Sequence, residues 1–164
     1  DMRKPVQHKL FVQANNKGLS NLLVGQFKLS DVLHEEVDSE VDVITAGTLP
    51  PNPSELVGSA NMQVLLEKLS DHYEYIFIDT PPINVVSDAM VLSNITAGIF
   101  LVTRQHYCTY SEYAKAVDSA KFANANILGV AINGARESNA KKNRRFGKYG
   151  YYRYEYKEDP GKTS

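Results

Sequence analysis

The octapeptide YIFIDTPP, residues Tyr75 to Pro82, carries the strongest signal in this sequence. Four apolar residues in a row are typical of a strand that is buried on both faces of a sheet. Asp79 follows directly, at the position where open α/β sheets place their ligand crevice. Thr80 and the two prolines then lead the chain out of the sheet, because proline restricts φ and lacks the N–H that a strand ladder needs. The octapeptide therefore predicts a central parallel strand with a carboxylate at its carboxyl end.

Strand and helix patterns alternate on both sides of this octapeptide. We expect further strands at Val41–Ala46, Gly98–Val102 and Ile127–Ile132, and helices at Ser54–Tyr73, Asp88–Asn94 and Ser111–Asn124. In the first of these helices Ser54 suits the N-cap, whereas Ser59 suits the start of a second helix. Strands that alternate with helices imply parallel pairing through right-handed crossovers. The predicted fold is an α/β three-layer sandwich with a mostly parallel sheet and helices on both faces.

The composition fits one compact domain and excludes several classes of protein. A chain of 164 residues with a formal net charge of −1 makes no electrostatic case for binding nucleic acid or membrane. The single cysteine, Cys108, excludes an intramolecular disulfide and fits a reducing cytoplasm. No apolar run approaches the roughly 18 to 20 residues that span a bilayer, and no signal peptide is visible. We therefore expect a cytoplasmic protein that another polypeptide must recruit if it works at a membrane.

The last 27 residues, 138–164, differ from the rest of the chain. They show no amphipathic period, and we expect them to form a flexible basic tail after a folded domain at residues 1–137. Half of the ten tyrosines lie within eight positions of this tail: Tyr149, Tyr151, Tyr152, Tyr154 and Tyr156. Taken alone, the tail fits two roles, namely stacking on single-stranded nucleic acid or accepting phosphoryl groups at several sites.

The carboxylate of Asp79 is well placed to hold Mg²⁺, usually through water, against nucleotide phosphates. The alternative is an ordinary aspartate that caps a strand in a turn. Four other strings accompany IDTPP at 78–82, in a fixed order: DMRKP at 1–5, NNKGLS at 15–20, TAGTLPPNPSEL at 45–56 and LGVAIN at 128–133. Together the five strings resemble the bacterial tyrosine kinases, relatives of the ParA/MinD-type P-loop ATPases that serve capsule and exopolysaccharide synthesis. The resemblance runs from residue 1 to about residue 133.

The resemblance implies an ATP- and Mg²⁺-dependent protein-tyrosine kinase that phosphorylates its own tyrosine cluster. By this likeness Asp79 is the Walker B aspartate, and Asp1 is the second aspartate of a D-x-D-x-R motif that assists metal binding and activates the attacking tyrosine. Arg3 is the arginine of the same motif. Asn133 matches an asparagine that reads the adenine edge, since an amide offers both a donor and an acceptor. Its alternative role is a strand or turn cap. The PPNP segment at 50–53 implies only a rigid turn.

One part of the family's pattern is missing. No G-x-x-x-x-G-K-[ST] motif occurs, and the GKT at 161–163 lacks the preceding glycine loop between a strand and a helix. In the family this Walker A loop precedes the D-x-D-x-R motif, and so it would lie before Asp1. We therefore expect an N-terminally truncated fragment, without the Walker A loop and first strand, that neither binds ATP tightly nor catalyses transfer by itself.

The resemblance also implies partners. It points to a membrane adaptor or activator protein, to neighbouring subunits in a ring homo-oligomer, and to a cognate phosphotyrosine phosphatase. It favours the acceptor role of the tail and implies no nucleic acid partner. Two other classes stay open, namely a ParA/MinD-like ATPase switch without kinase activity and a non-catalytic binding or substrate module.

Overall fold

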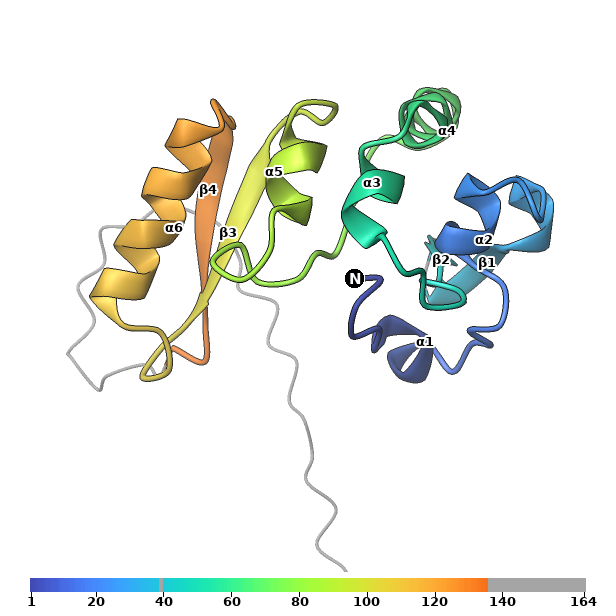
Figure 1. Ribbon diagram of the computed structural model, residues 1–164. Coiled ribbons are helices and arrows are strands. Elements are labelled where there is room, and N and C mark those ends of the chain that lie inside the picture. Colours follow the sequence, from blue (N-terminus) through green and yellow to red (C-terminus); the bar gives the residue numbers. More distant parts are fainter. Residues whose placement is uncertain (39, 136–164) are drawn as a thin grey trace, which may run out of the picture.

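The structure is a computed structural model and describes residues 1–38 and 40–135 (Figure 1). The tail predicted at 138–164, with its five tyrosines, lies outside the described residues. Along the chain the elements are α1 (Gln7–Leu10), α2 (Leu19–Leu23), the 3-10 helix η1 (Leu29–Asp31), β1 (Leu33–Asp38), β2 (Val41–Ile44), α3 (Pro53–Val57), α4 (Ala60–Ser70), α5 (Asp88–Ser93), β3 (Ile99–Arg104), α6 (Tyr110–Phe122) and β4 (Ile127–Asn133). None of the helices in the described part is long and apolar enough to cross a bilayer.

Strands β3 and β4 pair in parallel, as the sequence predicts, with α6 as the connection between them. Figure 1 shows α6 alongside this pair. The helix begins at a capping box in which Thr109 and Glu112 each accept a hydrogen bond from the backbone of the other, a device that satisfies two free amides of the first turn. On β3 the side chain of Leu101 is buried, whereas its neighbours Phe100 and Val102 are exposed. One face of the pair is therefore uncovered in the part of the chain described here.

A second small sheet is an antiparallel hairpin of β1 and β2, in which Leu33 pairs with Ile44. Strand β1 is not predicted by the sequence, because its residues LHEEVD are mostly charged or polar and lack a clean alternation. Strand β2 ends earlier than predicted. Beyond Ile44, the carbonyl of Thr45 accepts a hydrogen bond from the Leu19 amide at 2.8 Å, so the backbone bonds to a loop there.

Two of the strings in the sequence form one unit around this loop. Asn15 holds Gly47 from both sides: its side-chain amide donates to the Gly47 carbonyl at 3.1 Å, and its side-chain oxygen accepts from the Gly47 amide at 3.0 Å. A Cβ atom on Gly18 would lie 2.3 Å from the Gly47 nitrogen, far inside van der Waals contact. Glycine at position 18 is thus required by the close approach of the two backbones.

The helix expected at Ser54–Tyr73 is two helices, α3 and α4, which are interrupted at Gly58 and Ser59. The Ser59 hydroxyl accepts a hydrogen bond from the Met62 amide at 3.3 Å, which makes Ser59 the N-cap of α4. The prediction that Ser59 starts a second helix is therefore confirmed, and the single long helix is wrong. The main core cluster contains Met2, Leu23, Val57, Met62, Leu65, Leu69 and Leu92.

The segment Tyr75–Ile78, expected to be a buried central strand, is not a strand among the described residues. Tyr75 is 71% exposed and Phe77 is 89% exposed. A strand needs hydrogen-bonding neighbours, and burial on both faces needs a layer on each side. Within residues 1–38 and 40–135 no strand pairs with this segment, and the strands form two sheets of two instead of one larger sheet.

Candidate functional site

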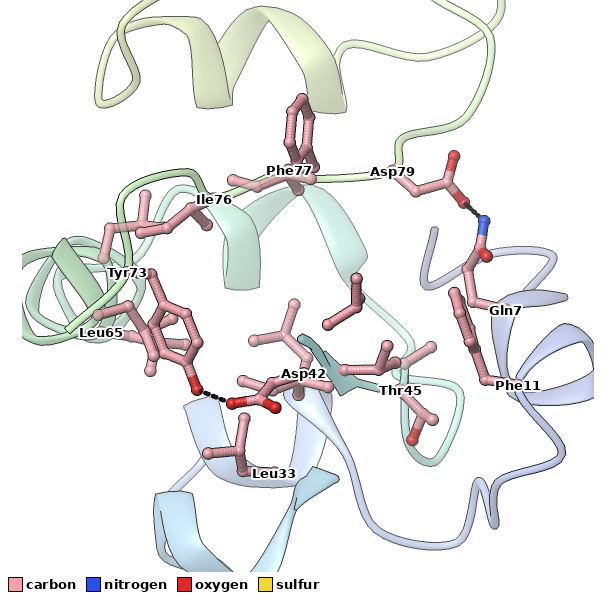
Figure 2. Close-up of a pocket in the computed structure, with 18 of the residues that line it drawn as sticks. Gln7, Phe11, Leu33, Asp42, Thr45, Leu65, Tyr73, Ile76, Phe77 and Asp79 are labelled. Atoms are coloured by element: carbon pink, nitrogen blue, oxygen red, sulfur yellow. Dashed lines mark hydrogen bonds between the residues drawn. The ribbon is translucent and has the colours of Figure 1, made fainter. Parts of the chain in front are cut away.

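The structure brings together Asp1 and Asp79, which are 78 positions apart in the sequence. The backbone nitrogen of Asp1 donates to the Asp79 carbonyl at 2.7 Å and lies 3.9 Å from the carboxylate oxygen Oδ2 of Asp79. That carboxylate is 48% exposed and accepts one hydrogen bond, from the side-chain amide of Gln7 at 3.1 Å (Figure 2). Asp79 is thus held in place from the α1 side while it stays open to solvent.

The carboxylate of Asp1 is fixed by the residues that follow it. Its Oδ1 oxygen accepts hydrogen bonds from the backbone amides of Arg3 at 2.7 Å and Lys4 at 3.0 Å. This is the local turn in which an aspartate caps the amides two and three residues further on. Met2, between them, is buried in the core. The segment 1–4 therefore presents Asp1 beside Asp79 in one defined arrangement.

A hollow of about 750 Å³ adjoins the two aspartates. Asp1, Gln7 and Asp79 lie at one rim, and the wall is largely apolar, with side chains from β2, α4 and the segment 75–78. Figure 2 shows the Phe77 ring pointing away from this space. The hollow lies between β2 and residues 75–78. Apart from the Phe77 ring, both segments offer apolar side chains to it.

Asp42 and Tyr73 close the other end of the hollow through a short hydrogen bond from the tyrosine hydroxyl to the carboxylate (Figure 2). This bond raises the pKa of Tyr73 to about 12. It also lowers the pKa of Asp42, together with a bond from the backbone amide of Glu36. The pair joins the hairpin to the end of α4.

Arg3 is held by Asp88 and Ser54, two residues that were not predicted from the sequence to belong to the site. The guanidinium donates from Nε to Oδ2 of Asp88 and from Nη2 to Oδ1, both at 2.9 Å, and Nη2 also donates to the Ser54 hydroxyl at 2.8 Å. The Ser54 hydroxyl donates to Oδ1 of Asp88 at 2.6 Å. Hydrogen bonding to Arg3 lowers the pKa of Asp88, and the same bonds raise the pKa of Arg3. Two features of the sequence could have pointed to these partners of Arg3: Ser54 follows PPNP directly, and an acidic residue stands at the start of α5.

Asn133 is not among the residues that line the hollow beside the two aspartates. It is the last residue of β4, it is exposed, and its carbonyl accepts a hydrogen bond from the Gln105 amide at 2.9 Å. Because β3 and β4 are parallel, Asn133 and Arg104 do share the carboxyl edge of their sheet.

Comparison with known proteins identifies the family. The chain is 42% identical over 133 residues to CapB of Staphylococcus aureus, a candidate tyrosine-protein kinase, a match that covers 81% of this chain and 58% of CapB. The structure of the VpsO kinase domain is 31% identical, with a TM-score of 0.77, and the match covers 83% of this chain and 68% of that domain. The chain belongs to the bacterial tyrosine kinases. The resemblance inferred from the five strings is therefore confirmed.

A further kinase structure supports the same P-loop fold. The kinase domain of Escherichia coli tyrosine kinase ETK matches with a TM-score of 0.80 and 36% identity, over 93% of this chain and 58% of that domain. No protein-family model matches the chain. The chain spans about three fifths of the length of CapB and of the ETK domain.

The side chains at this candidate site include donors that fit Mg²⁺. This ion favours oxygen ligands, keeps several waters and is commonly bound by one or two carboxylates together with substrate phosphates. Asp1 and Asp79 supply two carboxylates at one rim of the hollow. No group of three or more histidine, cysteine or acidic side chains is arranged to hold a metal in residues 1–38 and 40–135.

Proposed function

We propose that this chain forms the Walker B part of an ATP-dependent protein-tyrosine kinase that phosphorylates its own C-terminal tyrosine cluster and regulates capsule or exopolysaccharide synthesis. The observation that carries the proposal is the meeting of Asp1 and Asp79 at the rim of the hollow, although 78 positions separate them. Membership of the kinase family supports it.

In the proposed reaction Asp79 and Asp1 would hold Mg²⁺, which when bound would supply positive charge to offset that of the nucleotide phosphates. The phenolic oxygen of an acceptor tyrosine attacks the γ-phosphorus of ATP, and the bond to the β–γ bridging oxygen breaks. Asp1 orients the hydroxyl and takes up its proton. The acceptors are Tyr149, Tyr151, Tyr152, Tyr154 and Tyr156. Asn133 contacts the adenine edge in this proposal, and the place of Arg3 is argued below.

Phosphoryl transfer also needs a phosphate-binding loop, whose amides and lysine cradle the phosphates. The 164 residues contain no Walker A motif. We propose that a segment carrying this motif completes the kinase, and that these residues alone neither bind ATP tightly nor transfer phosphate. We call this chain together with such a segment the full-length kinase.

The proposed fold of the full-length kinase is a three-layer sandwich with one mostly parallel sheet. Among the described residues β2 pairs on one edge only, with β1, and Tyr75–Ile78 pairs on neither edge. The hollow between them is apolar and is lined from both sides. A further strand placed there would satisfy the backbone of both segments and cover the exposed apolar run.

The proposed setting is cytoplasmic, at the inner face of the plasma membrane, where a separate membrane activator recruits the kinase. Neighbouring subunits form a ring in which the tail of one enters the site of the next, and a phosphatase reverses the modification. Each phosphate adds about −1.5 to −2 charges near pH 7. Several phosphates would reverse the sign of a basic tail and loosen the ring.

A phosphotyrosine assay on the full-length kinase, with ATP, Mg²⁺ and the activator, tests this function. We expect phosphotyrosine that requires Asp79 and disappears when all five tail tyrosines are replaced by phenylalanine. Phosphotyrosine that persists in the five-fold variant would contradict the acceptor role. ATP hydrolysis without phosphotyrosine would indicate a ParA/MinD-like switch. The absence of both would favour a non-catalytic module, a class that the missing Walker A motif also suits.

A further inference from the structure

The PPNP turn has a structural consequence beyond rigidity. Pro53, the last residue of PPNP, is also the first residue of α3, where its missing N–H costs nothing. Ser54 is the next residue, and its hydroxyl faces Asp88 at the start of α5. Helices α3 and α5 pack against each other. The turn therefore places a hydroxyl beside a carboxylate from a distant part of the chain.

Asp88, Ser54 and Arg3 form a closed set of polar partners. Asp88 is only 3% exposed, yet both carboxylate oxygens accept hydrogen bonds, two from the guanidinium and one from the serine. A planar guanidinium that binds a carboxylate through two parallel bonds has one orientation, which a lysine ammonium does not reproduce. The carboxylate is buried. A guanidinium in the wrong orientation, or the loss of a partner, would therefore leave a charged group without its hydrogen bonds.

This set is linked to the candidate metal site through the backbone of the same arginine. The Arg3 amide donates to Oδ1 of Asp1, and the Asp1 nitrogen donates to the carbonyl of Asp79. The guanidinium thus fixes one end of a short path that leads from α3 and α5 to both aspartates. Met2 lies within this path and is buried, so it provides a second, apolar anchor.

We propose that Asp88 and Ser54 are positioning residues of the kinase: they clamp Arg3, and through the Arg3 backbone they set the orientation of the Asp1 carboxylate beside Asp79. The inference rests on the proposed kinase function and deepens it. It assigns Arg3 itself a positioning role, since its charge is paired with a buried carboxylate. In this proposal the PPNPS string places the Ser54 hydroxyl beside Asp88 and Arg3.

Steady-state kinetics of the full-length kinase test the clamp. Asp88→Asn, Arg3→Lys and Ser54→Ala keep the size of each group roughly the same but weaken the set. We expect Asp88→Asn and Arg3→Lys each to lower kcat at least about tenfold with a change in KM for ATP below about threefold, and Ser54→Ala to have a smaller effect, as for outer partners that orient a ligand. The kcat of the Asp88→Asn, Arg3→Lys double variant should be no lower than that of the more impaired single variant. Asp118→Asn, an exposed change on α6, is the matched control.

Hydrogen exchange in the same protein gives a readout that does not depend on activity. In the wild type the hydrogen bonds to Asp1 should protect the amides of Arg3 and Lys4. In Asp88→Asn these amides should exchange at least about tenfold faster, while exchange of the amides of α4 should be unchanged. Unchanged exchange at both amides would overturn the clamp, as would a kcat that falls only in proportion to the folded fraction. A wild type without phosphotyrosine would instead count against the proposed function, and the exchange result would still decide the clamp.

Discussion

Arg3 and Asp88 form a bidentate ion pair in which Nε and Nη2 of the arginine each lie 2.9 Å from one oxygen of a carboxylate that is almost fully buried. The two residues are 85 positions apart. The pair joins the N-terminal segment to α5. Because the Asp88 carboxylate is buried, small changes to this pair should measurably change the stability of the protein.

Removal of the Asp88 carboxylate should destabilise the protein. In Asp88→Ala the guanidinium of Arg3 and the hydroxyl of Ser54 lose their partner, and a cavity remains at the start of α5. We expect the free energy of unfolding to fall by about 2 to 4 kcal/mol. Urea unfolding of the full-length kinase measures it, with Asp118→Ala as an exposed control that should change by less than about 0.5 kcal/mol. Equal effects of the two variants would contradict this account.

The same pair predicts a pH dependence of stability. Hydrogen bonding to Arg3 holds the pKa of the Asp88 carboxyl below its unfolded value, so its contribution is fully present above that unfolded value, near pH 4. The contribution is lost as the pH falls through the lowered folded pKa. The difference in unfolding free energy between wild type and Asp88→Asn should therefore be large at pH 7 and shrink below about pH 4. A difference that stays constant down to pH 3 would exclude this linkage.

The Tyr73 hydroxyl should ionise at a higher pH than that of a free tyrosine. Its hydrogen bond to Asp42 raises its pKa to about 12, which is above the value of a free tyrosine. The stabilisation from this bond is fully present below pH 10 and is lost as the pH rises through the folded pKa. Titration of tyrosinate absorbance in wild type and Tyr73→Phe should differ by one tyrosine that ionises near pH 12. If the difference spectrum shows ionisation near pH 10, the bond to Asp42 does not persist in solution.

Asp79→Asn should remove activity with little loss of stability. The carboxylate is about half exposed and accepts a single side-chain hydrogen bond, from Gln7, so the fold depends on it weakly. Loss of a metal-holding carboxylate should lower Mg²⁺-dependent phosphotyrosine formation at least about 100-fold. Immunoblotting for phosphotyrosine and a thermal melt measure the two effects, with Asp118→Asn as the control. Retained phosphotyrosine in a folded Asp79→Asn protein would remove Asp79 from the site.

The segment Tyr75–Ile78 should behave differently in the 164-residue chain and in the full-length kinase. If a further strand fills the hollow, amides 75–78 gain ladder partners and exchange slowly in the full-length protein. In the shorter chain they should exchange rapidly, while the amides of β3 and β4 stay protected and serve as the internal reference. Equal exchange in the two proteins would contradict the proposed single sheet.

Several elements could be predicted because their signals are local. The helix expected at Ser111–Asn124 is observed as α6, and the helix expected at Asp88–Asn94 is observed as α5. Strands β3 and β4 are short apolar runs on either side of a helix, which predicts their parallel pairing. The Asp-Thr-Pro-Pro corner and its companion strings were sufficient to identify the kinase family, and the comparisons confirm that identification.

By itself, the sequence determined the α/β class, the kinase family and the candidate aspartates. Only the tertiary structure decided that Arg3 is paired with Asp88 and Ser54, that β1 completes a hairpin, and that Tyr75–Ile78 lacks strand partners among the described residues. The physical reason is the range of the interactions. Periodicity and caps depend on residues a few positions apart, whereas ion pairs and strand ladders depend on segments that only the folded chain brings together. An apolar run such as Tyr75–Ile78 indicates that a segment would pair with neighbouring strands, and only the structure shows whether such strands lie beside it.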